Sequence, residues 1–298
     1  MNQLQRINMI GSWLKERFKE KVVKLSLDGG FTCPNRDGTK GTGGCIFCSP
    51  DGSGELAGSI PQQIALLHDK WPAVHSYLAY FQSHTGTYAP IDYLESLYRS
   101  ALSASIPDGR IVGLAIATRP DCLGEEVMDL LQRLHRETFL WVELGLQTIH
   151  GDRINRCYPL AVYDEACRKL SRAGIPFVTH LILGLPGETE KDMEESVRYA
   201  CSSGAFGLKL HLLNVIKGST MEALFPGYTP FADPDDYIRL VCDLLEIIPW
   251  DITIHRLTGD VPRRLLIAPP WSYKKRTILN GIAREMQHRG SRQGCRCL

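Results

Sequence analysis

The sequence predicts an α/β protein whose parallel sheet curls into a barrel or an open part-barrel. Stretches with the composition of buried strands alternate six times in succession with stretches whose apolar residues recur at helical spacing. Strands that alternate with helices in this way pair in parallel through right-handed crossovers. We therefore expect a single domain over residues 1–298. Its core spans about 20–260, with short extensions at both ends.

The expected elements follow one another in a regular order. A helix over 8–20 precedes strands at 22–27, 77–82, 111–117, 139–146, 176–183, 206–215 and 251–255. Helices are expected between these strands at 60–70, 93–105, 125–136, 163–173, 191–201 and 234–247, and a last one over about 271–287. Gly174 is a typical C-terminal helix cap, and Thr189 is a typical N-terminal cap.

Three cysteines stand in the loop that directly follows the first expected strand. Cys33, Cys45 and Cys48 form a C-x11-C-x2-C pattern within GGFTCPNRDGTKGTGGCIFC. Structural zinc needs four protein ligands, usually from two C-x2-C pairs, and this chain has no second pair. Three thiolates on a cubane iron–sulfur cluster leave one iron open for a substrate or cofactor. The pattern favours such a cluster, with a three-cysteine zinc or disulfide loop as the alternative.

The same loop resembles the cluster loop of radical S-adenosylmethionine (SAM) enzymes, although the commoner form is C-x3-C-x2-C. It is similar to the YhcC-like family, whose loop reads GFTCPNRDG followed by GGC-x-[FY]-C, and more distantly to the radical SAM half of the Elongator catalytic subunit. The similarity runs from about residue 14 to residue 294. It implies a partial (β/α)6 TIM-like barrel, a [4Fe-4S] cluster on Cys33, Cys45 and Cys48, and SAM as a further cofactor.

The resemblance also implies a reaction. One electron, from a flavodoxin- or ferredoxin-type donor through the cluster, would cleave SAM to methionine and a 5′-deoxyadenosyl radical, which abstracts hydrogen from the substrate. The protein would contribute orientation and the exclusion of water.

Several residues near the strand ends are the expected SAM contacts. Phe47 occupies the aromatic position that the family places beside the adenine. Gln82 and Ser83 stand where many of these enzymes carry Gly-Gly-Glu, a motif that is absent here. Thr118 and Arg119 end the third strand, and Arg119 either holds the SAM carboxylate or stabilises a helix end.

Two further strands carry polar residues within apolar runs. Glu143 and Gln147 share one face, because side chains alternate along a strand. A buried carboxylate needs a partner, so Glu143 either contacts SAM or substrate, or forms an ion pair with a lysine such as Lys209. The sixth strand adds Asn214 after Lys209 and His211, with a histidine that is satisfied in the core as the alternative.

The loop after the fifth strand matches the I-x-G-x-x-x-E portion of a radical SAM motif. In that motif the isoleucine, here Ile182, packs on adenine, and the glutamate, here Glu188, stabilises the loop around the nucleoside. The capping role of Thr189 alone could also explain this run.

Composition indicates an ordinary globular chain of 298 residues, 44% hydrophobic and 22% charged. Its N-terminus has no apolar signal core, and no apolar run reaches the ~18 residues that span a bilayer. Ten cysteines diluted in a chain of this size point to a reducing compartment, so we expect a cytoplasmic protein without a membrane partner. Those in or beside the expected helices are interpreted as buried apolar side chains: Cys157, Cys167, Cys201 and Cys242.

The charge distribution suggests a phosphate-rich partner. Residues 263–298 hold nine basic residues and one acidic residue, a net charge of +8; because the whole chain carries +1, residues 1–262 carry −7. Together with the Elongator-like similarity, this predicts tRNA as substrate, with the wobble-uridine side chain as the modified group. For the basic segment, the alternative is a solvated helix with a frayed tail. For the function, the alternatives are a radical SAM enzyme acting on a small molecule such as a tetrapyrrole and a non-catalytic metal-binding RNA-interaction protein.

Overall fold

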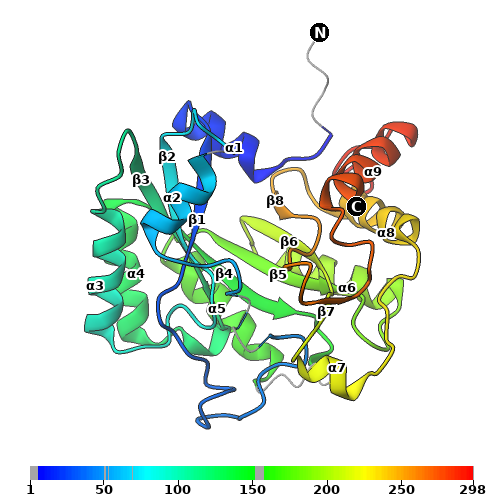
Figure 1. The fold of residues 1–298 in the computed structure, drawn as a ribbon, viewed down its shortest axis with the longest axis horizontal. Coiled ribbons are helices and arrows are strands. Elements are labelled where there is room, and N and C mark those ends of the chain that lie inside the picture. Colours follow the sequence, from blue (N-terminus) through cyan, green and yellow to red (C-terminus); the bar gives the residue numbers. More distant parts are fainter. Residues whose placement is uncertain (1–5, 50–51, 53, 69, 152–157, 298) are drawn as a thin grey trace.

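The computed structural model describes residues 6–49, 52, 54–68, 70–151 and 158–297. Seven parallel strands form one sheet in the order β1-β2-β3-β4-β5-β6-β8, which curls into a half-barrel (Figure 1). These strands are β1 (Val22–Leu27), β2 (Ser76–Phe81), β3 (Arg110–Thr118), β4 (Phe139–Gln147), β5 (Phe177–Leu183), β6 (Gly207–Leu212) and β8 (Thr253–Arg256). The expected partial barrel is confirmed. The short strand expected at 251–255 is present as β8 and joins the six barrel strands as the seventh strand of the sheet.

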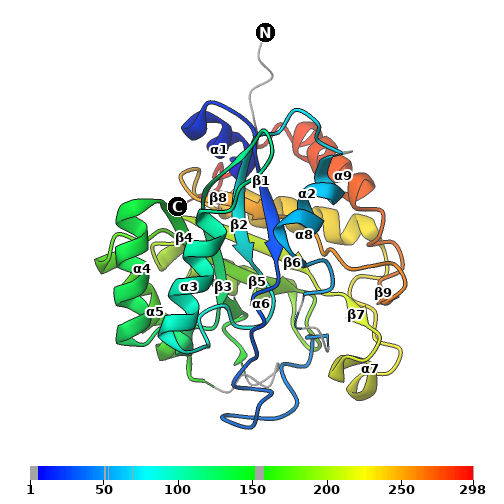
Figure 2. The same ribbon diagram turned by 60° about the vertical axis from the view of Figure 1, so that its left-hand side comes forward.

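Helices cover the outer face of the sheet (Figures 1 and 2). They are α2 (Ile60–His68), α3 (Ile91–Leu102), α4 (Glu125–Glu137), α5 (Leu160–Arg172), α6 (Glu190–Ser202) and α8 (Pro234–Ile247), with α9 (Lys275–His288) packed on α8. The main core lies between these two layers, where strand residues such as Leu25, Leu114 and Leu144 are fully buried. In the described part of the chain, no helix is long and apolar enough to cross a membrane.

The N-terminal helix closes one end of the half-barrel. Helix α1 (Ile10–Phe18) lies at the end opposite the loop that follows β1, as both views show (Figures 1 and 2). Its Trp13 stacks on Phe139 with 5.7 Å between ring centroids and meets the Phe206 ring edge-on at 4.9 Å. Trp141 is fully buried in the same cluster, which belongs to the inner face of the sheet. An apolar plug therefore seals the amino ends of the strands.

Two helix caps have the expected form. Gly174 follows α5 with φ of 68°, in the left-handed region that glycine enters without penalty. Thr189 caps α6, because its side chain accepts a hydrogen bond from the Asp192 amide while Asp192 bonds back to the Thr189 amide.

The region after β6 differs from the expectation. The strand ends at Leu212, and Val215 belongs instead to β7 (Val215–Ile216), which pairs in antiparallel fashion with β9 (Leu266–Ala268). A short helix α7 (Thr220–Leu224) follows and was not predicted, since its five residues are too few for periodicity to register. Cys167 and Cys242 are buried as expected and Cys201 is partly buried, whereas Cys157 lies outside the described residues.

Candidate functional site

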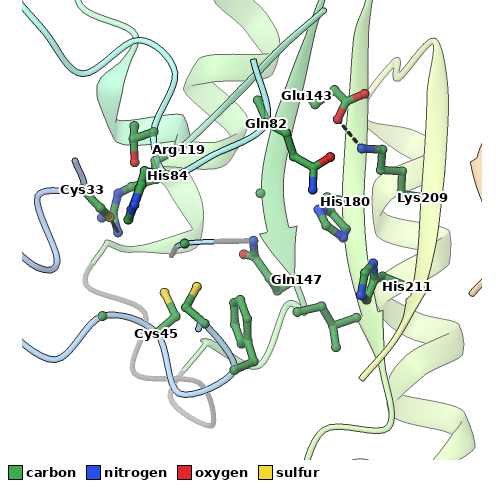
Figure 3. A pocket seen from close by; sticks show the side chains of 18 of the residues that line it. Cys33, Cys45, Gln82, His84, Arg119, Glu143, Gln147, His180, Lys209 and His211 are labelled. Carbon is green, nitrogen blue, oxygen red and sulfur yellow. Dashed lines mark hydrogen bonds and ion pairs between the residues drawn. The ribbon is translucent and has the colours of Figure 1, made fainter. Parts of the chain in front are cut away.

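A cavity of about 190 Å³ opens inside the half-barrel at the carboxyl ends of the strands. Eleven of the thirteen residues that the sequence singled out line it: Cys33, Cys45, Phe47, Cys48, Gln82, Thr118, Arg119, Glu143, Gln147, Ile182 and Asn214. Figure 3 shows Cys33 and Cys45 at one side of this cavity and Glu143 with Lys209 at the other. The carboxyl ends of parallel strands are the usual place for such a site, because the loops that follow the strands converge there.

The three cysteines occupy the loop after β1 as free, partly buried thiols. A tight turn joins Cys45 to Cys48, since the Cys48 amide donates to the Cys45 carbonyl at 3.0 Å. Structural zinc needs four protein ligands. Three thiolates therefore leave a structural zinc site one ligand short, whereas they complete the protein ligands of a cubane cluster with one open iron.

The surroundings of these thiols suit bound thiolates. The Arg119 guanidinium lies 3.8 Å from the Cys33 sulfur, and the Asn35 amide lies at the same distance from the Cys45 sulfur. A hydrogen bond from Cys48 lowers the pKa of Cys45 to about 7 against the opposing effect of burial, and the charge of Arg119 acts in the same direction. Free thiols supported by cations and N–H donors fit the ligand set of an iron–sulfur cluster.

Arg119 is fixed by its own neighbour. It donates two hydrogen bonds to Asp121, at 2.9 and 2.8 Å, and Lys40 pairs with the same carboxylate at 2.7 Å. The Tyr158 ring lies 5.3 Å from the guanidinium carbon. Asp121 belongs to the short 3-10 helix Pro120–Cys122 that begins after Arg119, so these contacts are compatible with both roles expected for Arg119. Arg119 is held beside the cluster cysteines.

A buried polar network forms the floor of the cavity. The Glu143 carboxylate accepts from Lys209 and from Tyr80 Oη at 2.6 Å, Lys24 Nζ at 3.3 Å and Trp141 Nε1 at 3.1 Å. Burial alone would raise the pKa of Glu143, but the charges of Lys209 and Lys24 hold it well below its usual range. The ion pair with Lys209 that the sequence left open is therefore present, and Glu143 also lines the cavity.

Two basic side chains of this network, Lys209 and His180, have lowered pKa values. Burial lowers the pKa of Lys209 to about 7, opposed by Glu143 and assisted by Lys24 and Arg256. Burial lowers the pKa of His180 to about 3, with the charge of Lys209 acting in the same direction. His180 is therefore neutral near pH 7.

Two of the predicted residues do not line the cavity. Ser83 is buried next to Gln82, in a bend after the end of β2, and is not among the residues that line the cavity. Glu188 accepts a hydrogen bond from Thr148, which ties the loop after β5 to the end of β4. Glu188 thus supports the cavity wall from behind.

The sequence analysis gave no role to Tyr80 or Lys24, which both bond to Glu143. Lys24 was detectable as the single charged residue in β1, and Tyr80 shares a strand face with Gln82. The backbone conformation of Gln147 could not be predicted from the sequence. Its φ is 63°, at the point where the pairing of β4 with β5 shifts register. Non-glycine residues in this conformation are concentrated at functional sites.

The fold and the site together define an α/β part-barrel enzyme with a three-cysteine cluster loop at its open end. A sequence profile of the radical SAM superfamily matches residues 36–200, and one of the radical SAM C-terminal domain matches residues 205–288. The chain is 43% identical to YtqA of Bacillus subtilis over 98% of its own length and 93% of that protein. It is 37% identical to YhcC of Escherichia coli K12, covering 97% and 95% of the two chains. The chain therefore belongs to the radical SAM superfamily, in the family of YtqA and YhcC.

Among solved structures, the fold is similar to that of archaeal Elp3 from Methanocaldococcus infernus, with a TM-score of 0.68 and 17% identity. The similarity covers 93% of this chain but only 64% of that one. At this identity the likeness concerns the fold.

The family uses a [4Fe-4S] cluster and SAM, and the residues present here fit both. Cys33, Cys45 and Cys48 would hold the cluster, whose chemistry with SAM supplies a 5′-deoxyadenosyl radical. Phe47 and Ile182 offer apolar surface for an adenine ring, because both pack in one small cluster beside the cavity. Gln82 and Gln147 extend their amides toward the same space (Figure 3), and Thr118 lines it while its hydroxyl bonds to Thr87. The strands and the α1 plug keep bulk water from the closed end, which protects a reactive species.

Proposed function

We propose that this radical SAM enzyme modifies tRNA, with the side chain of the wobble uridine as the reacting group. One observation carries the proposal: an exposed basic and aromatic surface adjoins the mouth of the cavity. We call it the mouth surface and define it as Arg263, Tyr273 and Lys274. The Elongator-like similarity described above gives the proposal its tRNA target.

The mouth surface combines charge with an accessible ring. Tyr273 is 43% exposed, and the Arg263 guanidinium lies 4.6 Å from its ring centroid and Lys274 Nζ 5.9 Å. A small depression lined by Tyr273 shares Asn214 and Asp260 with the cavity. Cationic side chains beside an exposed aromatic ring favour single-stranded nucleic acid, which offers phosphates and stacking bases.

The remaining basic residues of the C-terminal segment divide into two groups. Three of them form ion pairs within the protein: Arg289 with Asp243 at 2.6 Å and with Glu285 at 2.8 Å, Lys275 with Asp260 at 2.6 Å, and Arg296 with Glu246 at 3.3 Å. The other four are exposed, form no ion pair within the described residues and do not line the cavity: Arg264, Arg276, Arg284 and Arg292.

A flavodoxin- or ferredoxin-type protein completes the proposal as the electron donor. The chemistry requires one low-potential electron for each SAM cleaved, and such proteins deliver single electrons at suitable potentials.

The test compares two double variants of the anaerobically reconstituted enzyme. Arg263→Gln with Lys274→Gln removes two charges from the mouth surface, and Arg284→Gln with Arg292→Gln removes two from elsewhere in the same segment. Bulk tRNA affinity is measured across a range of salt concentrations. 5′-Deoxyadenosine is measured with and without tRNA, and the nucleosides of digested tRNA are followed by mass spectrometry.

We expect tRNA to increase 5′-deoxyadenosine formation and one wobble-position nucleoside to change in mass. The mouth-surface variant should lose affinity, with a salt dependence shallower by about 1.5 in slope, because two phosphate contacts are gone. The control variant should resemble the wild type. Deoxyadenosine formation that is indifferent to tRNA would overturn the tRNA proposal and favour a small-molecule substrate. Equal losses in both double variants would show that the charge of the segment, and not the mouth surface, attracts the nucleic acid.

A further inference from the structure

One cation in the cavity wall has no carboxylate partner. Arg256 ends β8, and its backbone is the register partner of Lys209 on β6. Its guanidinium reaches His211 Nδ1 at 3.3 Å, and within the described residues it forms no ion pair. Both Arg256 and His211 line the cavity.

The acidic groups near the cavity either bond to other residues or form no ion pair with Arg256 among the described residues. Glu143 receives four donors, from Lys209, Lys24, Tyr80 and Trp141. Asp260 pairs with Lys275 at 2.6 Å. Glu55, on the loop beyond Cys48, lines the cavity without an ion pair to Arg256 among the described residues.

The neighbours of Arg256 add no negative charge. His180 and His211 are neutral, since burial lowers the pKa of both, and their rings lie 5.2 Å apart. The Nε2 atom of His180 is buried without a hydrogen-bond partner in the described structure. Around the carboxylate of Glu143 the described residues thus place the cations Lys24 and Arg256 and, with a pKa of about 7, Lys209. A cation whose charge is left unbalanced in a partly closed site is costly unless an anion joins it.

We propose that Arg256 binds an anionic substituent of the substrate, either a carboxylate or a phosphate, with Lys209 and His211 beside it. A guanidinium can hold either anion through two parallel hydrogen bonds. The inference rests on the proposed function in one respect, that the reacting part of the substrate enters this cavity. It does not depend on that substrate being tRNA.

The position of Arg256 separates this role from the binding of SAM. Arg119, at the end of β3, and Arg36, within the cluster loop, are the cations that lie beside the cluster cysteines among the described residues. Arg256 stands on β8, with β4, β5 and β6 between the two strands. An anion at Arg256 therefore lies across the cavity from the cluster loop, where a substrate group belongs.

The first experiment titrates simple anions against the reconstituted protein. Sodium acetate or inorganic phosphate replaces chloride at constant ionic strength, and the thermal unfolding midpoint is followed. We expect a saturable rise for the wild type, with the more effective anion identifying the class. In Arg256→Gln the half-saturation concentration should increase about 10- to 100-fold, the effect of one lost charge-assisted hydrogen-bond pair. Arg256→Lys should retain part of the response, and Arg284→Gln should retain all of it.

The second experiment measures 5′-deoxyadenosine in Arg256→Gln. The tRNA-dependent increment should fall at least tenfold in Arg256→Gln, whereas Arg284→Gln, an exposed arginine that does not line the cavity, should keep the increment of the wild type. If tRNA never stimulates the wild type, the tRNA proposal fails, and the anion titration still decides this one. No saturable anion response, or an equal response in the wild type and Arg256→Gln, would overturn the inference.

Discussion

Replacing Glu143 with glutamine removes the single negative charge from the floor of the cavity while nearly conserving the size of the side chain. The exposed fractions of the Glu143 and Lys209 side chains are only 2% and 3%, so solvent cannot replace the lost charge. Lys209 and Lys24 would remain with no carboxylate between them. The variant therefore isolates the electrostatic contribution of this network.

The expected cost follows from burial. Breaking a buried ion pair from one side typically costs about 3–5 kcal/mol, because the remaining charge is left uncompensated. For a chain of 298 residues, about 2 °C of unfolding midpoint per kcal/mol gives a fall of roughly 6–10 °C. Lys209→Met should cost less, since Glu143 would keep Lys24, Tyr80 and Trp141. The double variant should recover part of the loss.

The loss should shrink as pH rises. The pKa of Lys209 is about 7 when folded and about 10.4 in an unfolded chain, so the unfolded state binds more protons between these values and stability rises with pH there. Without Glu143 the pKa of Lys209 in the folded state falls further. The stability of the variant therefore begins to rise at a lower pH than that of the wild type. Chemical denaturation at pH 6, 7 and 8.5 measures the convergence of variant and wild type.

A matched control tests whether burial is the cause. Glu137→Gln breaks an exposed pair with Arg99 and should leave the midpoint unchanged. The reasoning would be refuted by a Glu143→Gln protein as stable as the wild type at pH 6, or by Lys209→Met costing more than Glu143→Gln.

Three other predictions concern the cluster, a helix cap and a histidine. Alanine at Cys33, Cys45 or Cys48 should abolish retained iron and sulfide after reconstitution, whereas Cys122→Ala should retain both; iron in all of the variants would contradict the ligand assignment. Thr189→Ala should lower the free energy of unfolding by about 1 kcal/mol, measured with urea, because the capping box of α6 is lost. The imidazole NMR shifts of His180 should stay constant from pH 5 to 8, since its pKa is about 3, and a titration in that range would show that it is accessible and charged.

Most of the fold could be predicted because strand and helix patterns alternate without interruption. Once the strands are parallel, their carboxyl ends must lie together, which explains why eleven predicted residues share one cavity. Gln82 and Ser83 follow the end of β2, and only Gln82 lines the cavity, so the expected SAM contact of Ser83 stays a prediction.

Partners that lie across the lumen were harder to predict. Glu143 and Lys209 sit on β4 and β6, with β5 between them, so neither local spacing nor strand pairing brings them together. Their contact depends on the curvature of the sheet, which the sequence does not state. Likewise, the net charge of the C-terminal segment is larger than the charge available to a partner, because Arg289 and Lys275 form ion pairs within the protein.

Along the strands of the half-barrel, the charged floor of the cavity is followed by the residues near its open end. This order determines how a substrate would lie relative to SAM. From Glu143 to Gln147, four residues of β4 rise about 13 Å from the charged floor toward the open end of the cavity. A substrate held at the floor through an anionic end would present its next carbon toward the mouth. SAM, held near Arg119 and the cysteines, would face the same space from the opposite side. We therefore expect the hydrogen that is abstracted to lie within a few bonds of the anionic group, and deuterium placed there should be recovered in 5′-deoxyadenosine.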